Sequence, residues 1–199
     1  MQIAVARTFF EYFIKVNRLA SANTLPAGTT TCNGYTVPTN DVSPNSGIIN
    51  SDLHLYVLWE NKTPPSSYAV VASYCVLNSG PRFGTINFNT AHTYYSSITT
   101  INSFEFDRLV EIVIHEMTHV LGFSYSAIPQ WFQPGTTIPY GASVSTILST
   151  ATVRSISGSP ILSSPEVLAY AKAYYGCTTL TGMYLENQGG AGNVGSHWE

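Results

Sequence analysis

The segment His115-Glu116-Met117-Thr118-His119 has the residue types and the spacing needed for hydrolytic metal chemistry. Two histidines four residues apart lie on the same face of an α-helix, so both imidazoles can bind one ion. Zinc is held by such pairs at about 2.0–2.1 Å and lowers the pKa of a bound water to about 7. Glu116 follows the first histidine, where its carboxylate can accept a proton from that water. The motif therefore predicts one Zn²⁺ on His115 and His119, with Glu116 as the general base.

Helices are needed to place this motif, and the sequence predicts three of them. The longest pattern runs from about 104 to 121, with apolar residues recurring every three or four positions, and it contains the motif. A shorter amphipathic pattern covers 2–13. Another helix is indicated by the pair Ser164-Pro165 at its start and by Gly176 at its end. The motif is thus expected on a long helix near the middle of the chain.

Strands are expected before the long helix, at 51–59, 67–77 and 84–89. In the first of them, one face is expected to carry Leu53, Leu55, Val57 and Trp59. The third could be an edge strand along which a peptide substrate lies, or an interior strand. Thr, Asn, Ser, Pro and Gly predict loops and turns over 22–50 and 124–163, and the last twenty residues are expected to be irregular. Strands followed by a long helix indicate an α+β fold.

Composition excludes several classes of protein. The 199 residues suffice for one compact domain, and only 10% are charged, with a net charge of −3. Lys and Arg are scattered singly, so nothing in the sequence favours nucleic-acid binding. No apolar stretch approaches the ~18–20 residues that cross a bilayer. The N-terminal segment has the pattern of a folded helix, not of a cleavable signal. Low charge with many aromatics suits a secreted or surface protein.

A third zinc ligand is required, because catalytic zinc takes three protein ligands and a water. The metzincin pattern HExxHxxGxxH would place a histidine three residues after Gly122, but Tyr125 stands there. Its ring is expected to have a packing role. The remaining histidines are His54, expected to point outward from a strand, His92, expected in a loop, and His197. His197 is the best candidate, because the glycines around it let the backbone fold back towards a metal.

Glutamates offer an alternative third ligand, as in gluzincins. Glu166 is expected in the first turn of a helix, where the helix dipole explains a carboxylate without any metal. Glu186 precedes a glycine-rich run and is most simply a solvated side chain. The residues alone leave these two open beside His197.

Several segments together resemble the leishmanolysin family of surface metalloproteases: HEMTHVLGF, DLHLYV, SSPEVLAYAKAYYGCTTLTGMYLE, GGAGNVGSHWE and the cysteine at Cys75. The resemblance implies a metzincin-like zincin fold with a mixed twisted sheet, an N-terminal helix and an active-site helix. It assigns zinc to His115, His119 and His197 and the role of base to Glu116. It also implies a zinc endopeptidase that acts on peptides or proteins, is exported or membrane-anchored, and is associated with cell adhesion.

The resemblance also implies how the chain is organised. Residues 1–123 would form an N-terminal subdomain with the sheet and the active-site helix. Residues 124–199 would form an insertion and the start of a C-terminal subdomain carrying the third ligand. Metzincins have a methionine turn beyond that ligand, whereas the last methionine here, Met183, precedes His197. We therefore expect the sequence to be part of a longer protein.

The cysteines suggest an oxidising compartment. Cys32 and Cys75 both lie in the N-terminal half and are predicted to form a disulfide, the alternative being two buried free thiols. Cys177 is then left over, and its partner is expected beyond the sequence. Asn61-Lys62-Thr63 is a glycosylation sequon. One functional alternative stays open at this point: a non-catalytic surface or adhesion module that keeps the fold without turnover.

Overall fold

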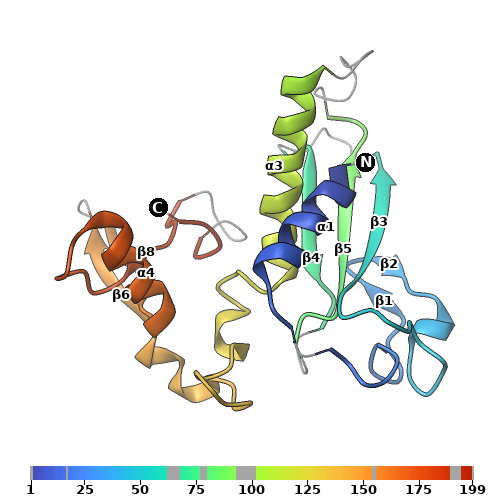
Figure 1. The fold of residues 1–199 in the computed structure, drawn as a ribbon, viewed down its shortest axis with the longest axis horizontal. Helices are drawn as coiled ribbons and strands as arrows, with labels where there is room; N and C mark the ends of the chain where they lie inside the picture. Colours follow the sequence, from blue (N-terminus) through green and yellow to red (C-terminus); the bar gives the residue numbers. More distant parts are fainter. Residues whose placement is uncertain are drawn as a thin grey trace. The chain divides into compact units, whose positions relative to one another are not determined.

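A computed structural model describes residues 2–16, 18–61, 68–76, 80–92, 102–153, 156–188 and 194–198 (Figure 1). The chain divides into two compact units, Met1–Gly122 and Phe123–Glu199. Lys62 and Thr63 of the sequon lie outside the described residues. Helices and strands occur in both units, as an α+β fold requires.

The first unit is built on a three-stranded sheet of order β3-β5-β4. β5 (Phe83–Asn89) runs parallel to β3 (His54–Glu60) and antiparallel to β4 (Val70–Tyr74). Every residue of β5 is buried. The edge position considered for this strand is therefore wrong: β5 is interior, and β4 is an outer strand of the described sheet.

Two helices pack on one face of this sheet, α1 (Gln2–Phe13) and α3 (Ser103–Val120), as Figure 1 shows. The buried residues shared by the helices and strands are Ala6, Val70, Ala72, Ile86, Phe88, Val113, Met117 and Val120. The end of α3 lies so close to β5 that a Cβ at Gly84 would collide with the Val120 side chain. Glycine at position 84 thus lets α3 pack tightly on the sheet.

Local signals fix the ends of α3. The Asn102 side chain accepts a hydrogen bond from Glu105 N (3.0 Å), and Glu105 Oε2 accepts one from Asn102 N (3.2 Å), which forms a capping box. Gly122 follows with a φ of 94°, in the left-handed region that ends many helices. The predicted helix and its glycine stop are both confirmed.

The opposite face of the sheet is covered by the segment between α1 and β3. It contains a 3-10 helix (Thr39–Asp41) and a two-stranded hairpin, β1 (Thr31–Cys32) and β2 (Tyr35–Thr36). Tyr56 of β3 is buried against this segment and donates a hydrogen bond to Asp41 Oδ2 (2.8 Å). Burial and this carboxylate raise the pKa of the Tyr56 phenol well above its usual range.

The expected face of the first strand is confirmed, but only its first part is covered. Leu53 and Leu55 do face the helices, but Val57 is 45% exposed and Trp59 63% exposed, whereas Tyr56 on the other face is buried. The side chains alternate as predicted, but the strand is covered on both faces near its start. Elements far away in sequence supply that cover, so the strand's own pattern does not show it.

The second unit holds an antiparallel sheet, β6 (Leu148–Val153), β7 (Ile156–Leu162) and β8 (Met183–Tyr184), with α4 (Pro165–Tyr175). The unit also contains two 3-10 helices, Ile128–Gln130 and Gly141–Thr146. Its core comprises Ile128, Tyr140, Ile147, Leu162 and Leu185. The prediction of α4 is confirmed, with Ser164 as N-cap and Gly176 in the left-handed region. The expectation of loops over 124–163 is wrong for β6 and β7.

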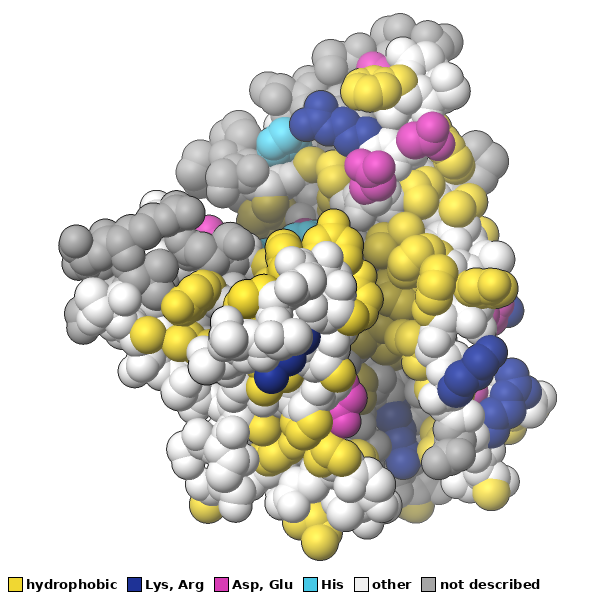
Figure 2. All heavy atoms as spheres, turned by 60° about the vertical axis from the view of Figure 1, so that its left-hand side comes forward, with side chains coloured by type: hydrophobic (Ala, Val, Ile, Leu, Met, Phe, Trp, Pro, Cys, Tyr) yellow, Lys and Arg dark blue, Asp and Glu magenta, His cyan; other side chains and the backbone are white. Residues whose placement is uncertain are grey.

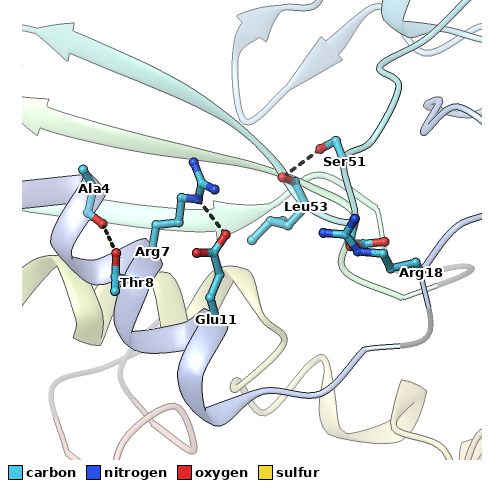
Figure 3. A network of polar contacts seen from close by, with 8 residues as sticks. Ala4, Arg7, Thr8, Glu11, Arg18, Ser51 and Leu53 are labelled. Carbon is cyan, nitrogen blue, oxygen red and sulfur yellow. Dashed lines mark hydrogen bonds and ion pairs between the residues drawn. The ribbon is translucent and has the colours of Figure 1, made fainter.

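Charged side chains of the first unit form ion pairs at the surface of the described residues. Figure 3 shows Arg7 and Glu11 on α1 with an ion pair between them, and the Arg7 Nε lies 2.8 Å from Glu11 Oε1. The Arg18 Nε lies 3.8 Å from Asp52 Oδ2. Ser51 Oγ donates to Leu53 O (3.0 Å) where the chain enters β3 (Figure 3). In the view of Figure 2, the charged side chains form small, separate groups among hydrophobic side chains and other atoms. No described helix is long and apolar enough to span a membrane.

Candidate metal centre

His115 and His119 lie one turn apart on α3, and the structure brings their rings together. The two Nε2 atoms are 3.3 Å apart, and the ring centroids are 5.0 Å apart. Two nitrogens bound at about 2.0–2.1 Å to one tetrahedral ion lie about 3.3–3.4 Å from each other. The pair therefore fits two positions of a zinc site without rearrangement. Neutral imidazole nitrogens are also the donors that zinc prefers.

Glu116 points from α3 towards the outer strand of the sheet. Its Oε2 accepts a hydrogen bond from the backbone N–H of Ala72 in β4, with an N–O distance of 2.8 Å. Burial raises the pKa of the Glu116 carboxyl to about 7, although the hydrogen bond from Ala72 opposes this shift. A carboxyl with a pKa near neutrality can both take up and release a proton, which is what general acid–base catalysis requires.

The pairing of β4 explains why Ala72 can reach Glu116. Ala69 O accepts a hydrogen bond from β5, and Cys75 N donates one to β5. Bonded residues alternate along an antiparallel ladder, so Val70, Ala72 and Tyr74 direct their backbone groups away from β5. The N–H of Ala72 consequently lies on the outer edge, where it donates its hydrogen bond to Glu116.

Two contacts hold the end of β4 in place. A disulfide joins Cys32 and Cys75, the predicted pair, with the Cα atoms 4.9 Å apart. Asn33 Nδ2 donates to Ser73 O (3.2 Å), Tyr74 O (3.3 Å) and Thr85 Oγ1 (2.9 Å). The hairpin thereby fastens the strand that orients the glutamate. Sequence reasoning found the disulfide but missed both Asn33 and the role of Ala72.

His197 lies in the second unit and is held from two sides by Glu186. Its Nδ1 is 2.8 Å from Glu186 Oε2, and Glu186 N donates to His197 O (2.8 Å). Gly195 N also donates to Glu186 O (2.7 Å). The expectation that Glu186 is a solvated side chain is wrong, because its carboxylate bonds the imidazole and is only 32% exposed. The part of His197 in metal binding remains a prediction.

Tyr125, at the position of the expected metzincin histidine, packs within the second unit. A Cβ at Gly195 would lie 2.5 Å from Tyr125 Cδ2 and 2.8 Å from its Cβ. The Phe123 ring contacts the Trp198 ring, with centroids 5.0 Å apart. The residues that follow α3 thus pack against the residues on both sides of His197.

The other candidate residues lie elsewhere in the fold. His54 packs its ring against Tyr56 and Phe83, at centroid distances of 5.0 and 5.7 Å, so the expectation that it points outward is wrong. His92 follows β5 in a turn, and its N–H donates to Asn89 O. Glu166 lies in the first turn of α4.

Cys177 makes no disulfide within the described residues. Its Sγ is 3.4 Å from Thr179 Oγ1, and hydrogen bonds with Thr179 lower the pKa of its thiol. The cysteine follows α4 directly. Its predicted pairing outside the sequence stays a prediction.

An open cavity of about 460 Å³ lies beside the histidine pair, within the first unit. Tyr68–Val70 at the start of β4 line one side, and Glu111, Ile112, His115 and Glu116 of α3 line the other. Its size is that of a small-molecule or side-chain pocket. Sequence reasoning missed this cavity, because it depends on how α3 packs along β4.

Comparisons with known proteins agree with the motif and the fold. A family model described as leishmanolysin matches residues 9–199. The chain is 31% identical over 175 residues to the leishmanolysin homolog of Crithidia fasciculata and to the leishmanolysin of Leishmania chagasi. These matches cover 86% and 85% of this chain, but 23% and 25% of the relatives. A leishmanolysin-like peptidase of Caenorhabditis briggsae is 27% identical over 184 residues, which is 77% of this chain and 27% of that protein. The chain spans about a quarter of the length of these relatives.

Proposed function

Because this chain belongs to the leishmanolysin family of metallopeptidases, we propose that it carries the metal-binding helix and the base of a zinc endopeptidase. The observation that carries the proposal is the geometry on α3. The Nε2 atoms of His115 and His119 have the spacing that one tetrahedral ion requires, and a half-buried carboxyl follows the first of them.

We propose His197 as the third ligand. Glu186 bonds its Nδ1, which leaves Nε2 as the nitrogen for a metal, and a carboxylate on the far nitrogen is typical of metal-binding histidines. Trp198, its neighbour, contacts Phe123, which directly follows the last residue of the first unit. The Glu186 carboxylate already bonds the His197 imidazole, so we propose the histidine and not this glutamate as the third ligand.

The proposed reaction divides between the metal and the residues of the chain. Zinc held by the three histidines would supply an acidified water and polarise the scissile carbonyl. Glu116 takes the proton from the attacking water and passes it to the leaving amine. The N–H of Ala72 fixes the direction of the Glu116 carboxylate, and burial keeps its pKa where both transfers are feasible at neutral pH.

The outer edge of β4 is the proposed place for the peptide backbone. Val70, Ala72 and Tyr74 direct their backbone groups outward, beside the base. Ala72 N is bonded to Glu116 and Tyr74 O to Asn33, so a substrate added as an antiparallel strand would bond to the remaining outward groups of β4, with a peptide bond next to Glu116. The sequence had offered residues 84–89 as the edge strand for a peptide substrate, and we now propose β4 instead.

The disulfide between Cys32 and Cys75 supports export of the protein to an oxidising compartment, in agreement with the surface location that the resemblance implies.

Substitution Glu116→Gln in the full-length protein tests the proposed function. Glutamine keeps the size of the side chain and accepts the bond from Ala72, but it cannot act as a base. We expect kcat to fall by about 10²-fold or more, with zinc content unchanged. Asp107→Asn, which removes a carboxylate from the same helix, serves as control. Peptide cleavage near the wild-type rate in Glu116→Gln would refute the mechanism, and a zinc-loaded wild type without any cleavage would favour the non-catalytic module.

A further inference from the structure

The sequon Asn61-Lys62-Thr63 follows β3 directly, and the proposed chemistry of the site makes no use of it. Its acceptor residue, Asn61, lies within the described residues and is exposed. No other Asn of the sequence is followed two positions later by Ser or Thr. The Cys32–Cys75 disulfide indicates an oxidising compartment, and exported proteins are the ones that are glycosylated at such sequons. Asn61 thus combines the sequence, the exposure and the compartment that N-glycosylation requires.

An exposed aromatic ring stands two residues before this acceptor. Trp59, near the end of β3, is 63% exposed, although tryptophan is on average among the well-buried residues. Its ring stacks on the buried Phe88 ring, with centroids 4.6 Å apart and an angle of 19° between the ring planes. This contact fixes the plane of the indole, while most of the side chain stays open to solvent. Trp59 therefore offers a preformed aromatic surface next to the sequon.

Strand geometry brings this ring and the acceptor to the same face. Thr90 N donates to Glu60 O (3.0 Å), so pairing with β5 continues up to the residue before Asn61. Side chains two positions apart in a strand share a face and are about 6.4–6.8 Å apart along it. Continuing the alternation of β3 by one residue places Asn61 on the face of Trp59 and of Val57, which is 45% exposed. A sugar attached to Asn61 can therefore fold back over the indole.

We propose that Asn61 carries an N-linked glycan whose first sugar packs on Trp59. The donor is an oligosaccharide joined to a lipid pyrophosphate. In the transfer, Asn61 Nδ2 forms a bond to the anomeric carbon of the first sugar, the bond from that carbon to the pyrophosphate oxygen breaks, and the amide nitrogen loses one proton. Nothing is oxidised or reduced. The C–H groups of the sugar ring carry partial positive charge and pack on the negative face of the indole. The proposal rests on the proposed export of the protein and is independent of the peptidase chemistry.

The glycan would also cover an exposed part of the sheet. β3 is an outer strand of the described sheet, and outer strands present backbone groups with which another chain can pair. Val57 and Trp59 add exposed apolar surface at the same place. A hydrated oligosaccharide at the end of β3 covers this surface and keeps it soluble.

The modification is tested on the full-length protein isolated from the cells that make it. A peptide N-glycosidase in H₂¹⁸O converts a glycosylated Asn61 into Asp that carries ¹⁸O, which mass spectrometry detects in the peptide that contains residue 61. We expect this label in the wild type and in Thr63→Ser, which keeps the sequon, and its loss in Thr63→Ala, which keeps the acceptor only. An unmodified Asn61 in the wild type overturns the proposal. If Cys32 and Cys75 are reduced in the same sample, the proposed export fails with it.

The role of Trp59 is tested by comparing the Tm of Thr63→Ser with that of Thr63→Ala. Loss of the glycan should lower the Tm by about 2–4 °C when Trp59 is present, the shift expected for one aromatic contact. The shift should persist with Trp59→Phe and fall below about 1 °C with Trp59→Ala. Tyr170→Ala, which removes an exposed aromatic ring of α4, is the control and should leave the shift unchanged. Equal shifts with Trp59 and with Trp59→Ala would overturn the packing of the sugar on this ring.

Discussion

Replacing Glu186 should weaken zinc binding through His197, although Glu186 is not itself the proposed ligand. Its Oε2 lies 2.8 Å from His197 Nδ1 and favours the tautomer with the proton on that nitrogen, which leaves Nε2 free to bind a metal. Losing such a partner costs about 10–100-fold in metal affinity. The imidazole and the carboxylate are 26% and 32% exposed, so water screens the contact, and we expect the lower half of that range.

The assay is competition for zinc with a chelator of known affinity, in the full-length protein. Glu186→Ala should raise the zinc Kd by about 10–30-fold, and Glu186→Gln, which can still accept a bond from Nδ1–H, should have a smaller effect. In the metal-free protein, ¹⁵N NMR should show the His197 tautomers becoming mixed in Glu186→Ala. The backbone bond between Glu186 N and His197 O is retained in both variants, which limits wider damage.

Glu166→Ala is the matched control, since Glu166 is an acidic residue of the second unit at the start of α4. Its zinc affinity should equal that of the wild type. The reasoning is refuted if Glu186→Ala keeps both the wild-type zinc affinity and a single His197 tautomer. It is also refuted if Glu166→Ala loses zinc more severely, because that would identify a glutamate as the third ligand.

Two further predictions concern the strand that orients the base. Ala72→Pro removes the N–H bonded to Glu116 and should lower kcat/KM about 10–100-fold. Ala72→Gly keeps the N–H, so its kcat/KM should stay within about threefold of the wild-type value. Equal losses in the two variants would contradict the role of this hydrogen bond. Removing the Cys32–Cys75 disulfide, which closes a separation of 43 residues, should cost about 4 kcal/mol in denaturant unfolding, while Cys177→Ala should cost little; a loss below about 1 kcal/mol would contradict this prediction.

The long helix and its motif could be predicted because their determinants are local. All the signals that define α3 lie within about twenty residues of sequence: its apolar period, Glu105 in its first turn and Gly122 after its end. Histidines four apart on a helix share a face, so the spacing predicts that the two rings can approach each other, and their Nε2 atoms are 3.3 Å apart. The same holds for α4, whose cap and stop stand next to it in sequence.

The missed elements depend on partners that are distant in sequence. β6 and β7 contain Ser, Thr, Gly158 and Pro160, which as local signals indicate turns. They form strands because they pair with each other, in a register that is irregular between Ala151 and Val153. The burial of Tyr56 likewise requires the loop around Asp41. Propensity alone could not reveal either, since pairing outweighs it.

The same distinction divides the site itself. His115, Glu116 and His119 are fixed by one helix, but the N–H that bonds Glu116 comes from Ala72, 44 residues earlier in the chain. It is available because β4 is an outer strand of the described sheet, and strand order is not encoded in any single strand. The cavity lined by Glu111 exists for the same reason. Sequence thus predicts the chemistry of the site, and packing determines its substrate side.

The substitution of Tyr125 for the expected histidine has a structural consequence of its own. The end of α3 would fix the position of a histidine three residues after Gly122. His197 lies far along the chain, so contacts with other residues must fix its position. Tyr125 lies under Gly195, whose φ of 76° and missing Cβ allow this contact, and Phe123 packs on Trp198. Tyr125, which stands where a metzincin would carry its third histidine, therefore packs against the segment that contains His197. A side chain at Gly195 would collide with Tyr125 and would disturb this packing two residues before His197.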